Sequence, residues 1–137
     1  MIHLDTNAVI AVLNNKSPAV RTRIGAAIVA GRPLAMSSIV LFELRYGAAK
    51  SARPDRNVQR IADFLVGPIE VLPFESEDAD EAGDIRAALE RVGTPIGPYD
   101  VLVAAQARRR DALLVTANGC EFARVPRLRF EDWAIPQ

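Results

Sequence analysis

Three acidic residues stand alone in apolar surroundings, far apart along the chain. Asp5 follows the mostly apolar run 1–4, Glu43 lies inside the apolar stretch 39–44, and Asp100 precedes the apolar stretch 101–105. A carboxylate in a low-dielectric environment is costly unless its charge is compensated. Three such carboxylates brought together would repel one another unless a cation lay between them. We therefore hypothesise that Asp5, Glu43 and Asp100 converge on a metal ion.

The residue types favour a hard cation. Carboxylate oxygens select Mg²⁺ or Mn²⁺, whereas Zn²⁺ sites are usually built from histidine and cysteine. The chain has one histidine, His3, and one cysteine, Cys120, so a zinc site and a Ser–His nucleophile pair are not expected. We interpret His3 as a packing residue of a strand.

Strands and helices are predicted to alternate along the chain. Apolar runs and turn residues predict strands at 2–4, 34–36, 69–72, 112–115 and 128–130. Helices are predicted at 7–13, from Pro18 to Gly31, at 39–49, from Pro54 to near Val66, at 76–92 and 99–109, with one turn at 120–123. This alternation favours an α/β fold with a central parallel sheet of four to five strands and helices on both faces. Residues 1–137 are predicted to form a single domain.

The predicted elements place the acids where ligands bind. In an open α/β sheet, ligands bind outside the carboxyl ends of the strands, and Asp5 stands at such an end. Glu43 falls in the second turn of the helix that Ser38 is predicted to cap, and Asp100 in the first turn of its own helix. The acids between Glu75 and Asp84 are interpreted instead as the solvated outer face of helix 76–92.

The composition is that of an ordinary globular protein. Half of the 137 residues are hydrophobic, a quarter are charged, and the formal net charge is zero. This balance argues mildly against affinity for nucleic acid driven by phosphate alone, and the arginine clusters are interpreted as surface. No apolar run approaches the roughly 20 residues of a membrane helix, and no signal-peptide pattern is found. With its single cysteine, the chain is expected in a reducing cytoplasm without membrane contact.

Four motifs together resemble the PIN-domain ribonucleases, specifically the VapC toxins of bacterial type II toxin–antitoxin pairs. They are LDTN at 4–7, SSIVLFELRYG at 37–47, IGPYD at 96–100, and VTAN at 115–118 with EF at 121–122 and VP at 125–126. A DTN triplet alone is weak support, but the four motifs in this order and spacing are specific. The resemblance covers nearly the whole chain.

The resemblance implies a PIN-domain fold and an acidic pocket that binds Mg²⁺, with Mn²⁺ as an alternative. Asp5, Glu43 and Asp100 fall on the three core acids of the family, as metal ligands and catalytic residues. The implied reaction is hydrolysis of RNA phosphodiesters by metal-activated water, which leaves a 5′-phosphate and a 3′-hydroxyl. Structured RNA such as transfer RNA is the implied substrate.

The fourth acidic position departs from the commonest family pattern. Many relatives carry an aspartate two residues after the threonine, where this chain has Asn118. Glu121 is the candidate for a fourth catalytic carboxylate, and the number of metal ions stays open. Thr6, Ser38, Thr116 and Asn118 are predicted to orient the acids or their waters through hydrogen bonds.

The implied partners are other proteins as well as RNA. Relatives are inhibited by a VapB-type antitoxin, and an arginine of such a partner could pair with the acids. A homodimer is expected, within a toxin–antitoxin hetero-oligomer. Exposed helix faces near Phe42, Leu44 and Tyr46, or near Phe64, are the candidate dimer surfaces.

Three other readings compete with a ribonuclease. A response-regulator receiver domain also has carboxylates at strand ends, but it needs an acid pair near its first strand and a late lysine, and no lysine follows Lys50. A PIN-fold module that binds RNA or a partner without cutting is the main alternative, since Asn118 replaces an acid. The same nuclease acting on DNA is the third reading.

Overall fold

Five parallel strands form the central sheet in the order β3-β2-β1-β4-β5. The structure is a computed structural model that describes residues 1–135. The strands are β1 (Ile2–Leu4), β2 (Leu34–Ser37), β3 (Ile69–Leu72), β4 (Leu113–Val115) and β5 (Arg129–Glu131). The central strand β1 pairs with β2 on one side and β4 on the other, so Asp5 leaves the middle of the sheet.

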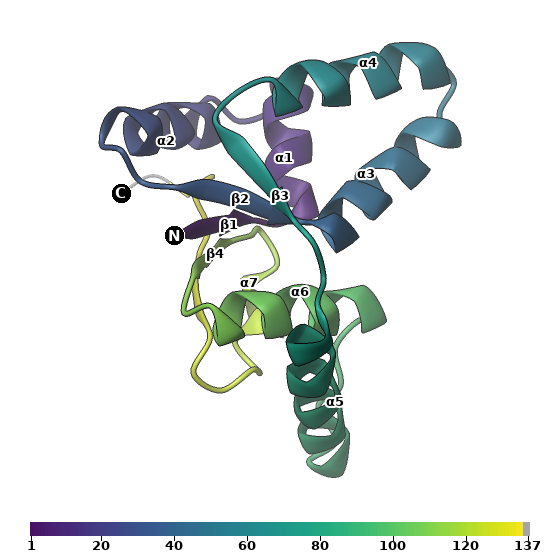
Figure 1. Cartoon of the computed structure of the whole chain (residues 1–137), viewed down its shortest axis with the longest axis vertical. Helices are drawn as coiled ribbons and strands as arrows, with labels where there is room; N and C mark the ends of the chain where they lie inside the picture. The colour runs from purple at the N-terminus through teal and green to yellow at the C-terminus, as the bar shows by residue number, and fades with distance from the viewer. Residues whose placement is uncertain (136–137) are drawn as a thin grey trace.

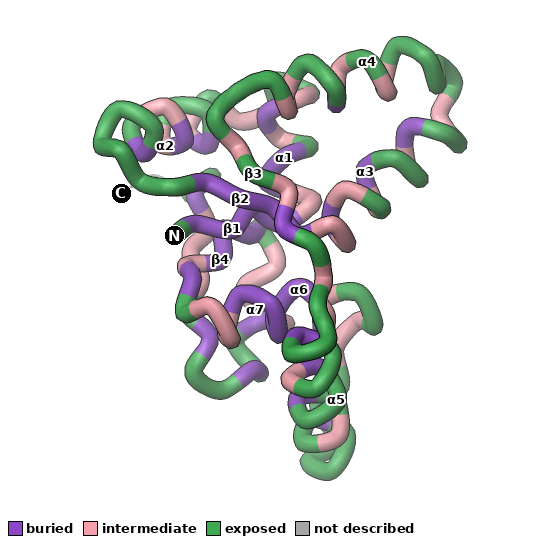
Figure 2. The backbone as a smooth tube through the Cα atoms, in the orientation of Figure 1, coloured by how far each residue is buried: buried purple, intermediate pink, exposed green. Residues whose placement is uncertain are grey.

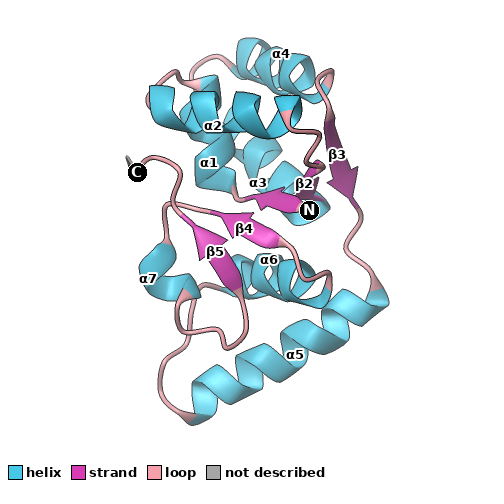
Figure 3. Ribbon diagram, turned by 90° about the vertical axis from the view of Figure 1, so that its left-hand side faces the viewer, coloured by secondary structure: helices cyan, strands magenta, loops and turns pink. Residues whose placement is uncertain are grey.

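Helices cover both faces of this sheet. They are α1 (Thr6–Leu13), α2 (Pro18–Val29), α3 (Ser38–Ala49), α4 (Pro54–Leu65), α5 (Ser76–Arg91), α6 (Pro98–Arg109) and the short α7 (Gly119–Phe122). Figures 1 and 3 show α1, α2 and α4 on one side of the sheet and α5 and α6 on the other. The predicted α/β architecture with a parallel sheet is therefore confirmed, with most element ends within one or two residues of their predicted positions.

The hydrophobic core extends over both faces of the sheet and includes residues of β1, β2 and α6. Figure 2 shows these elements mostly buried, whereas α4 and α5 expose one face. Short apolar strands with helices on both sides are buried on both faces, which explains the uninterrupted apolar runs in the sequence. His3 of β1 is only 2% exposed, so its interpretation as a packing residue is confirmed. Burial, followed by the positive charge of Arg110, lowers the pKa of His3 to about 4, so the ring is neutral at pH 7.

The start of α3 differs from the prediction. The helix is capped by Ser37, whose Oγ accepts the backbone N–H of Ile39 at 3.0 Å, so the predicted Ser38 cap is wrong. The reason is that β2 runs one residue further than predicted and the turn into α3 shifts with it. The Ser38 hydroxyl instead accepts the backbone N–H of Phe74 at 3.1 Å.

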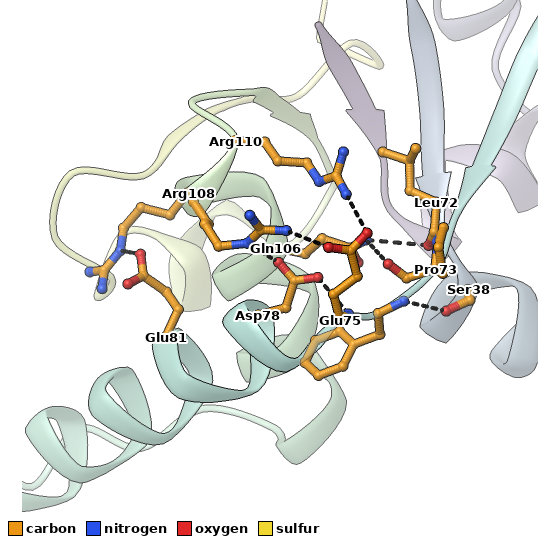
Figure 4. A network of polar contacts seen from close by, with 11 residues as sticks. Ser38, Leu72, Pro73, Glu75, Asp78, Glu81, Gln106, Arg108 and Arg110 are labelled. Carbon is orange, nitrogen blue, oxygen red and sulfur yellow. Dashed lines mark hydrogen bonds and ion pairs between the residues drawn. The ribbon is translucent and has the colours of Figure 1, made fainter.

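Ion pairs hold α5 against α6. This α5–α6 ion-pair cluster, drawn in part in Figure 4, joins three acids of the α5 region to three consecutive arginines at the end of α6: Glu75, Asp78 and Glu81 with Arg108, Arg109 and Arg110. Asp78 is fully buried and accepts from Nε of Arg109. The interpretation of the acidic run as a solvated face is therefore wrong for Asp78, which lies in the inner stripe of α5.

A buried glutamine connects α6 to the sheet by hydrogen bonds. Nε2 of Gln106 donates to the carbonyl oxygens of Leu72 and Pro73, both at 3.2 Å, at the end of β3. Because α6 is rigid, these contacts at its C-terminal half also fix its first turn, which carries Asp100. Within residues 1–135, no helix has the length and apolar character needed to cross a membrane.

Candidate active site

Asp5 is held at the carboxyl end of the central strand. It is the N-cap of α1, only 4% exposed, and its Oδ1 accepts the backbone N–H of Thr6 at 2.9 Å. Its Oδ2 accepts the Thr116 hydroxyl at 2.8 Å, across from the end of β4. Burial raises the pKa of Asp5 against the lowering effect of these two hydrogen bonds. The carboxylate is thus fixed in geometry, while its charge is left uncompensated.

Glu43 reaches the same place from α3. The Thr6 hydroxyl donates to its Oε1 at 3.0 Å, so Thr6 bonds Asp5 through its backbone and Glu43 through its side chain. Burial raises the pKa of Glu43, and the charge of Asp5 raises it further, against the hydrogen bond from Thr6. The predicted orienting role of Thr6 therefore has a structural basis in a direct contact.

Asp100 and Glu121 form the opposite side of the site. Asn118 bridges them, with Nδ2 donating to Glu121 Oε2 at 2.8 Å and to Asp100 Oδ2 at 3.4 Å. Burial raises the pKa of Asp100 to about 7, together with a hydrogen bond to the Glu121 carboxyl and the charges of Asp5, Glu121 and Glu43. The same hydrogen bond, with that from Asn118, lowers the pKa of Glu121. The same contact therefore moves the pKa values of the two carboxyl groups in opposite directions.

Backbone geometry leaves room for the Asp100 carboxylate. Gly97, the N-cap of α6, lies so close that a Cβ on it would stand 3.2 Å from Asp100 Oδ2. Any larger residue at this position would press on the carboxylate. The glycine of the IGPYD motif thus has a local role that the sequence reading did not assign.

The structure brings the four predicted acids together, which we call the carboxylate site: Asp5, Glu43, Asp100 and Glu121. Thr6 bonds both Asp5 and Glu43, and the Thr116 hydroxyl bonds both Asp5 and the backbone of Asn118. The Asn118 amide in turn bonds Asp100 and Glu121. Among residues 1–135, no three acidic, histidine or cysteine side chains are already gathered as a set of metal ligands. Carboxylates repel one another, so without a cation we expect the acids to lie in two pairs, each linked by hydrogen bonds, Asp5 with Glu43 and Asp100 with Glu121.

The donor set of the carboxylate site fits a hard divalent cation. All the ligand atoms on offer are carboxylate oxygens, which suit Mg²⁺ and Mn²⁺. None of the ion pairs within the described chain involves these four acids. The positive charge of Arg124 adds to the lowering of the pKa of Glu121. Its guanidinium itself donates to the Pro95 carbonyl at 2.8 Å.

The predicted hydrogen-bond partners divide into two groups. Thr6, Thr116 and Asn118 contact the acids directly, whereas Ser38 bonds the backbone of Phe74 and has no contact with a carboxylate. The structure thus gives Ser38 another partner than the predicted one, because the residue stands five positions before Glu43 on α3 and so lies on another face of the helix. Sequence reasoning missed Asn7, whose amide touches both Asp5 and Thr116. Its place in the DTN triplet was the available signal.

An α/β fold with four acids at the carboxyl edge of a five-stranded parallel sheet defines the class of protein. A sequence model of the PIN domain matches residues 2–128, and the chain belongs to the PIN-domain family, among its VapC proteins. The VapC protein of Shigella flexneri, named a tRNA(fMet)-specific endonuclease, is 44% identical over 96% of both chains. Its namesake from Salmonella typhimurium is 42% identical over 95% of this chain and 96% of its own. The receiver-domain alternative is therefore wrong.

Solved structures agree with the sequence relatives. VapBC2 from Rickettsia felis, bound to a DNA fragment from its promoter, matches with a TM-score of 0.90 and 34% identity over 97% of this chain and 99% of that one. DNA-bound VapBC from Salmonella typhimurium matches with a TM-score of 0.88 and 42% identity over 96% and 97%. The fold of this chain is thus that of the VapC family.

Proposed function

We propose that this VapC-family nuclease is an endoribonuclease that uses a divalent cation, Mg²⁺ or Mn²⁺. Asp5, Glu43 and Asp100 would hold the cation, with Glu121 as a fourth catalytic carboxylate. The observation that carries the proposal is the convergence of four carboxylates at one sheet edge, where they raise the pKa of Asp100 and take part in no ion pair with residues 1–135. The ribonuclease names of the relatives support RNA as the substrate.

The side chains of this protein have separate tasks in that reaction. Asp5 and Glu43 present fixed oxygens, because Thr6 and Thr116 bond their other lone pairs. Asp100 would bind the cation as a carboxylate, next to Glu121, to which Asn118 links it. A bound divalent cation would supply charge neutralisation at the scissile phosphate and a lower pKa for an attacking water. The P–O3′ bond breaks, leaving a 5′-phosphate and a 3′-hydroxyl.

The substrate we propose is structured RNA, with transfer RNA first. Two relatives at 42% and 44% identity are named tRNA(fMet)-specific endonucleases. We place this reaction in the cytoplasm, where transfer RNA is found. DNA belongs in the assay as a second substrate, because the carboxylate site by itself treats both backbones alike.

The proposed function is tested by cleavage of total RNA and of matched single-stranded DNA, with Mg²⁺ or with chelator. We expect RNA fragments with 5′-phosphates in Mg²⁺ and none with chelator. Asp5→Asn should lower the cleavage rate at least about 100-fold. Changing a hydrogen-bond partner of a metal ligand already costs about 10- to 100-fold in activity, and changing the ligand itself should cost more. Glu70→Gln, on exposed edge strand β3, is the matched control and should cleave as wild type. Equal cleavage by Asp5→Asn, or in chelator, would overturn the proposal.

The second part of the proposal is a VapB-type antitoxin partner. The solved relatives are VapBC complexes, and the carboxylate site offers uncompensated acids to an arginine of such a partner. Co-expression with a VapB-type antitoxin should yield a complex that does not cleave RNA. Active nuclease eluting alone from that preparation would count against it.

We also propose a homodimer within that complex. Phe42 and Tyr46 are 49% and 58% exposed on α3, with Phe42 against Tyr99 of α6 at a centroid distance of 5.5 Å. Leu44 is buried in the core and cannot belong to an exposed face. Sedimentation of wild type and of Tyr46→Ser tests the dimer, since a monomer at micromolar concentration in both would refute it.

A further inference from the structure

The amide of Asn7 makes contacts that connect two distant segments. Its Oδ1 accepts the backbone N–H of Ala117 at 2.9 Å, 110 residues away in the chain. Its Nδ2 faces Thr116 Oγ1 at 3.3 Å and Asp5 Oδ2 at 3.4 Å. Because a backbone N–H can only donate, the atom facing Ala117 must be the amide oxygen, which places the NH₂ group toward Thr116 and Asp5.

These contacts determine what the Thr116 hydroxyl does. The hydroxyl donates to Asp5 Oδ2 at 2.8 Å and accepts the backbone N–H of Asn118 at 3.0 Å. A hydroxyl has one proton to give. Two N–H donors, from Asn7 and Asn118, occupy its lone pairs and leave Asp5 as the acceptor of that proton.

The same contacts hold the loop that follows β4. Asn7 bonds Ala117 directly, and Asn118, the next residue, bridges Glu121 and Asp100 with its amide. One side chain at the start of α1 therefore contacts Asp5 directly and reaches the Asp100–Glu121 pair through the 116–118 loop. It binds Asp5 on one side and the loop that presents Asn118 on the other.

We propose that Asn7 is a positioning residue, which fixes the Thr116 hydroxyl on Asp5 and the 116–118 loop over the Asp100–Glu121 pair. The inference rests on the proposed function, because positioning matters only if the four acids share a cation. It adds a residue whose two amide protons are both engaged, one by Asp5 and one by Thr116. It acts through Asp5, Thr116 and Ala117.

Only an amide meets these demands at this position. An aspartate would keep the acceptor for Ala117 but lose the donor and add a charge beside Asp5. Alanine would lose the acceptor for Ala117 and the donor to Thr116 and Asp5. Serine keeps a small polar group on the first turn of α1 and serves as a second variant if alanine folds poorly.

The experiment measures Mn²⁺ affinity by the paramagnetic resonance signal of free Mn²⁺, at fixed pH, beside the melting temperature of each variant. Asn7→Ala and Asn7→Ser should bind Mn²⁺ about 10-fold more weakly, the size found for hydrogen-bond partners of metal ligands. Asn14→Ala, at the far end of α1, is the matched control and should bind as wild type. The cleavage assay should show the loss in kcat more than in KM.

A double-mutant cycle with Thr116→Val separates positioning from general support of the fold. If Asn7 acts through Thr116, the two losses of Mn²⁺ affinity will fall short of additivity. Full additivity, or wild-type affinity in both Asn7 variants, would overturn the inference alone. A wild-type protein that binds no Mn²⁺ would overturn the proposed function and the inference together.

Discussion

Two groups of acids in this chain have opposite surroundings. At the carboxylate site, Asp5 and its neighbours bond hydroxyl and amide groups, and the pKa of Asp100 rises to about 7. In the α5–α6 ion-pair cluster, Asp78 is fully buried but bonds Arg109. Burial alone would raise the pKa of Asp78, yet the hydrogen bonds and charges of its partners lower it.

The comparison separates a completed site from an incomplete one. An arginine satisfies both the hydrogen-bonding and the charge of a buried carboxylate. Neutral donors satisfy only the hydrogen-bonding, so they fix the oxygens and leave the negative charge in place. We infer that the first arrangement serves the fold and that the second is suited to an exchangeable cation.

The largest effect is expected from leaving Asp78 without its counter-charge. Arg109→Met should destabilise the protein by about 3 kcal/mol, because breaking a buried pair leaves an uncompensated charge. Urea unfolding measures this, and the folded variant should still cleave RNA. Arg86→Met, which removes an exposed i,i+4 pair with Glu90, is the control and should change stability by less than about 1 kcal/mol. Equal losses of stability in the two variants would mean that Arg109 does not compensate a buried charge on Asp78.

Sequence reasoning found the carboxylate site because each of its core acids interrupts an apolar run. Asp5, Glu43 and Asp100 each stand out within their own few residues. Asp78 does not stand out, since it lies among other acids and its partner Arg109 is 31 residues further on. The strands were found for the same local reason, as short apolar runs bounded by turn residues.

Details that depend on tertiary contacts were out of reach. Ser37 and Ser38 are equally good caps in sequence, and only the pairing of β2 with β3 through Ser37 decides between them. Asn7 reads as a residue near the start of α1, because its partner Ala117 lies 110 residues away. The local sequence pattern therefore predicts which polar residues stand out as candidates, and the tertiary fold determines which partners they contact.

The pH dependence of stability should separate the two groups of acids. In chelator, Asp100 binds its proton more tightly in the folded state, with a pKa of about 7, than in the unfolded chain, with the ordinary value of 3.8. Its contribution to stability is therefore present at low pH and is lost as the pH rises from about 4 through 7. The contribution of Asp78 to stability has the opposite pH dependence, because its pKa is lowered by folding. That contribution is present above the ordinary pKa of an aspartate and is lost as the pH falls into the acid range.

Melting temperatures of wild type and Asp100→Asn across pH 4–8 measure the Asp100 contribution. The wild type should lose several degrees relative to the variant over this range. His3, whose lowered pKa acts in the opposite direction between about 4 and 6.5, cancels in the difference. Mg²⁺ should restore the wild type at pH 8 and leave the variant less affected. Parallel profiles in chelator would mean that Asp100 ionises as an ordinary aspartate.

The smallest effect is expected where an uncharged bridge could become a charged one. Asn118→Asp would introduce the acid that the resemblance to the family leads one to expect here, but it would also replace the donor that now bridges Asp100 and Glu121. Like charges so close together repel, so the variant should melt a few degrees lower in chelator. With Mn²⁺ the added carboxylate should strengthen binding several-fold, because one more anionic oxygen faces the cation. Asn14→Asp at the end of α1, which keeps the oxygen that accepts from Arg60, should change neither quantity. If Asn118→Asp weakens Mn²⁺ binding instead, the amide bridge is itself the better partner for this set of acids, and the departure from the family pattern is a functional adjustment of the site.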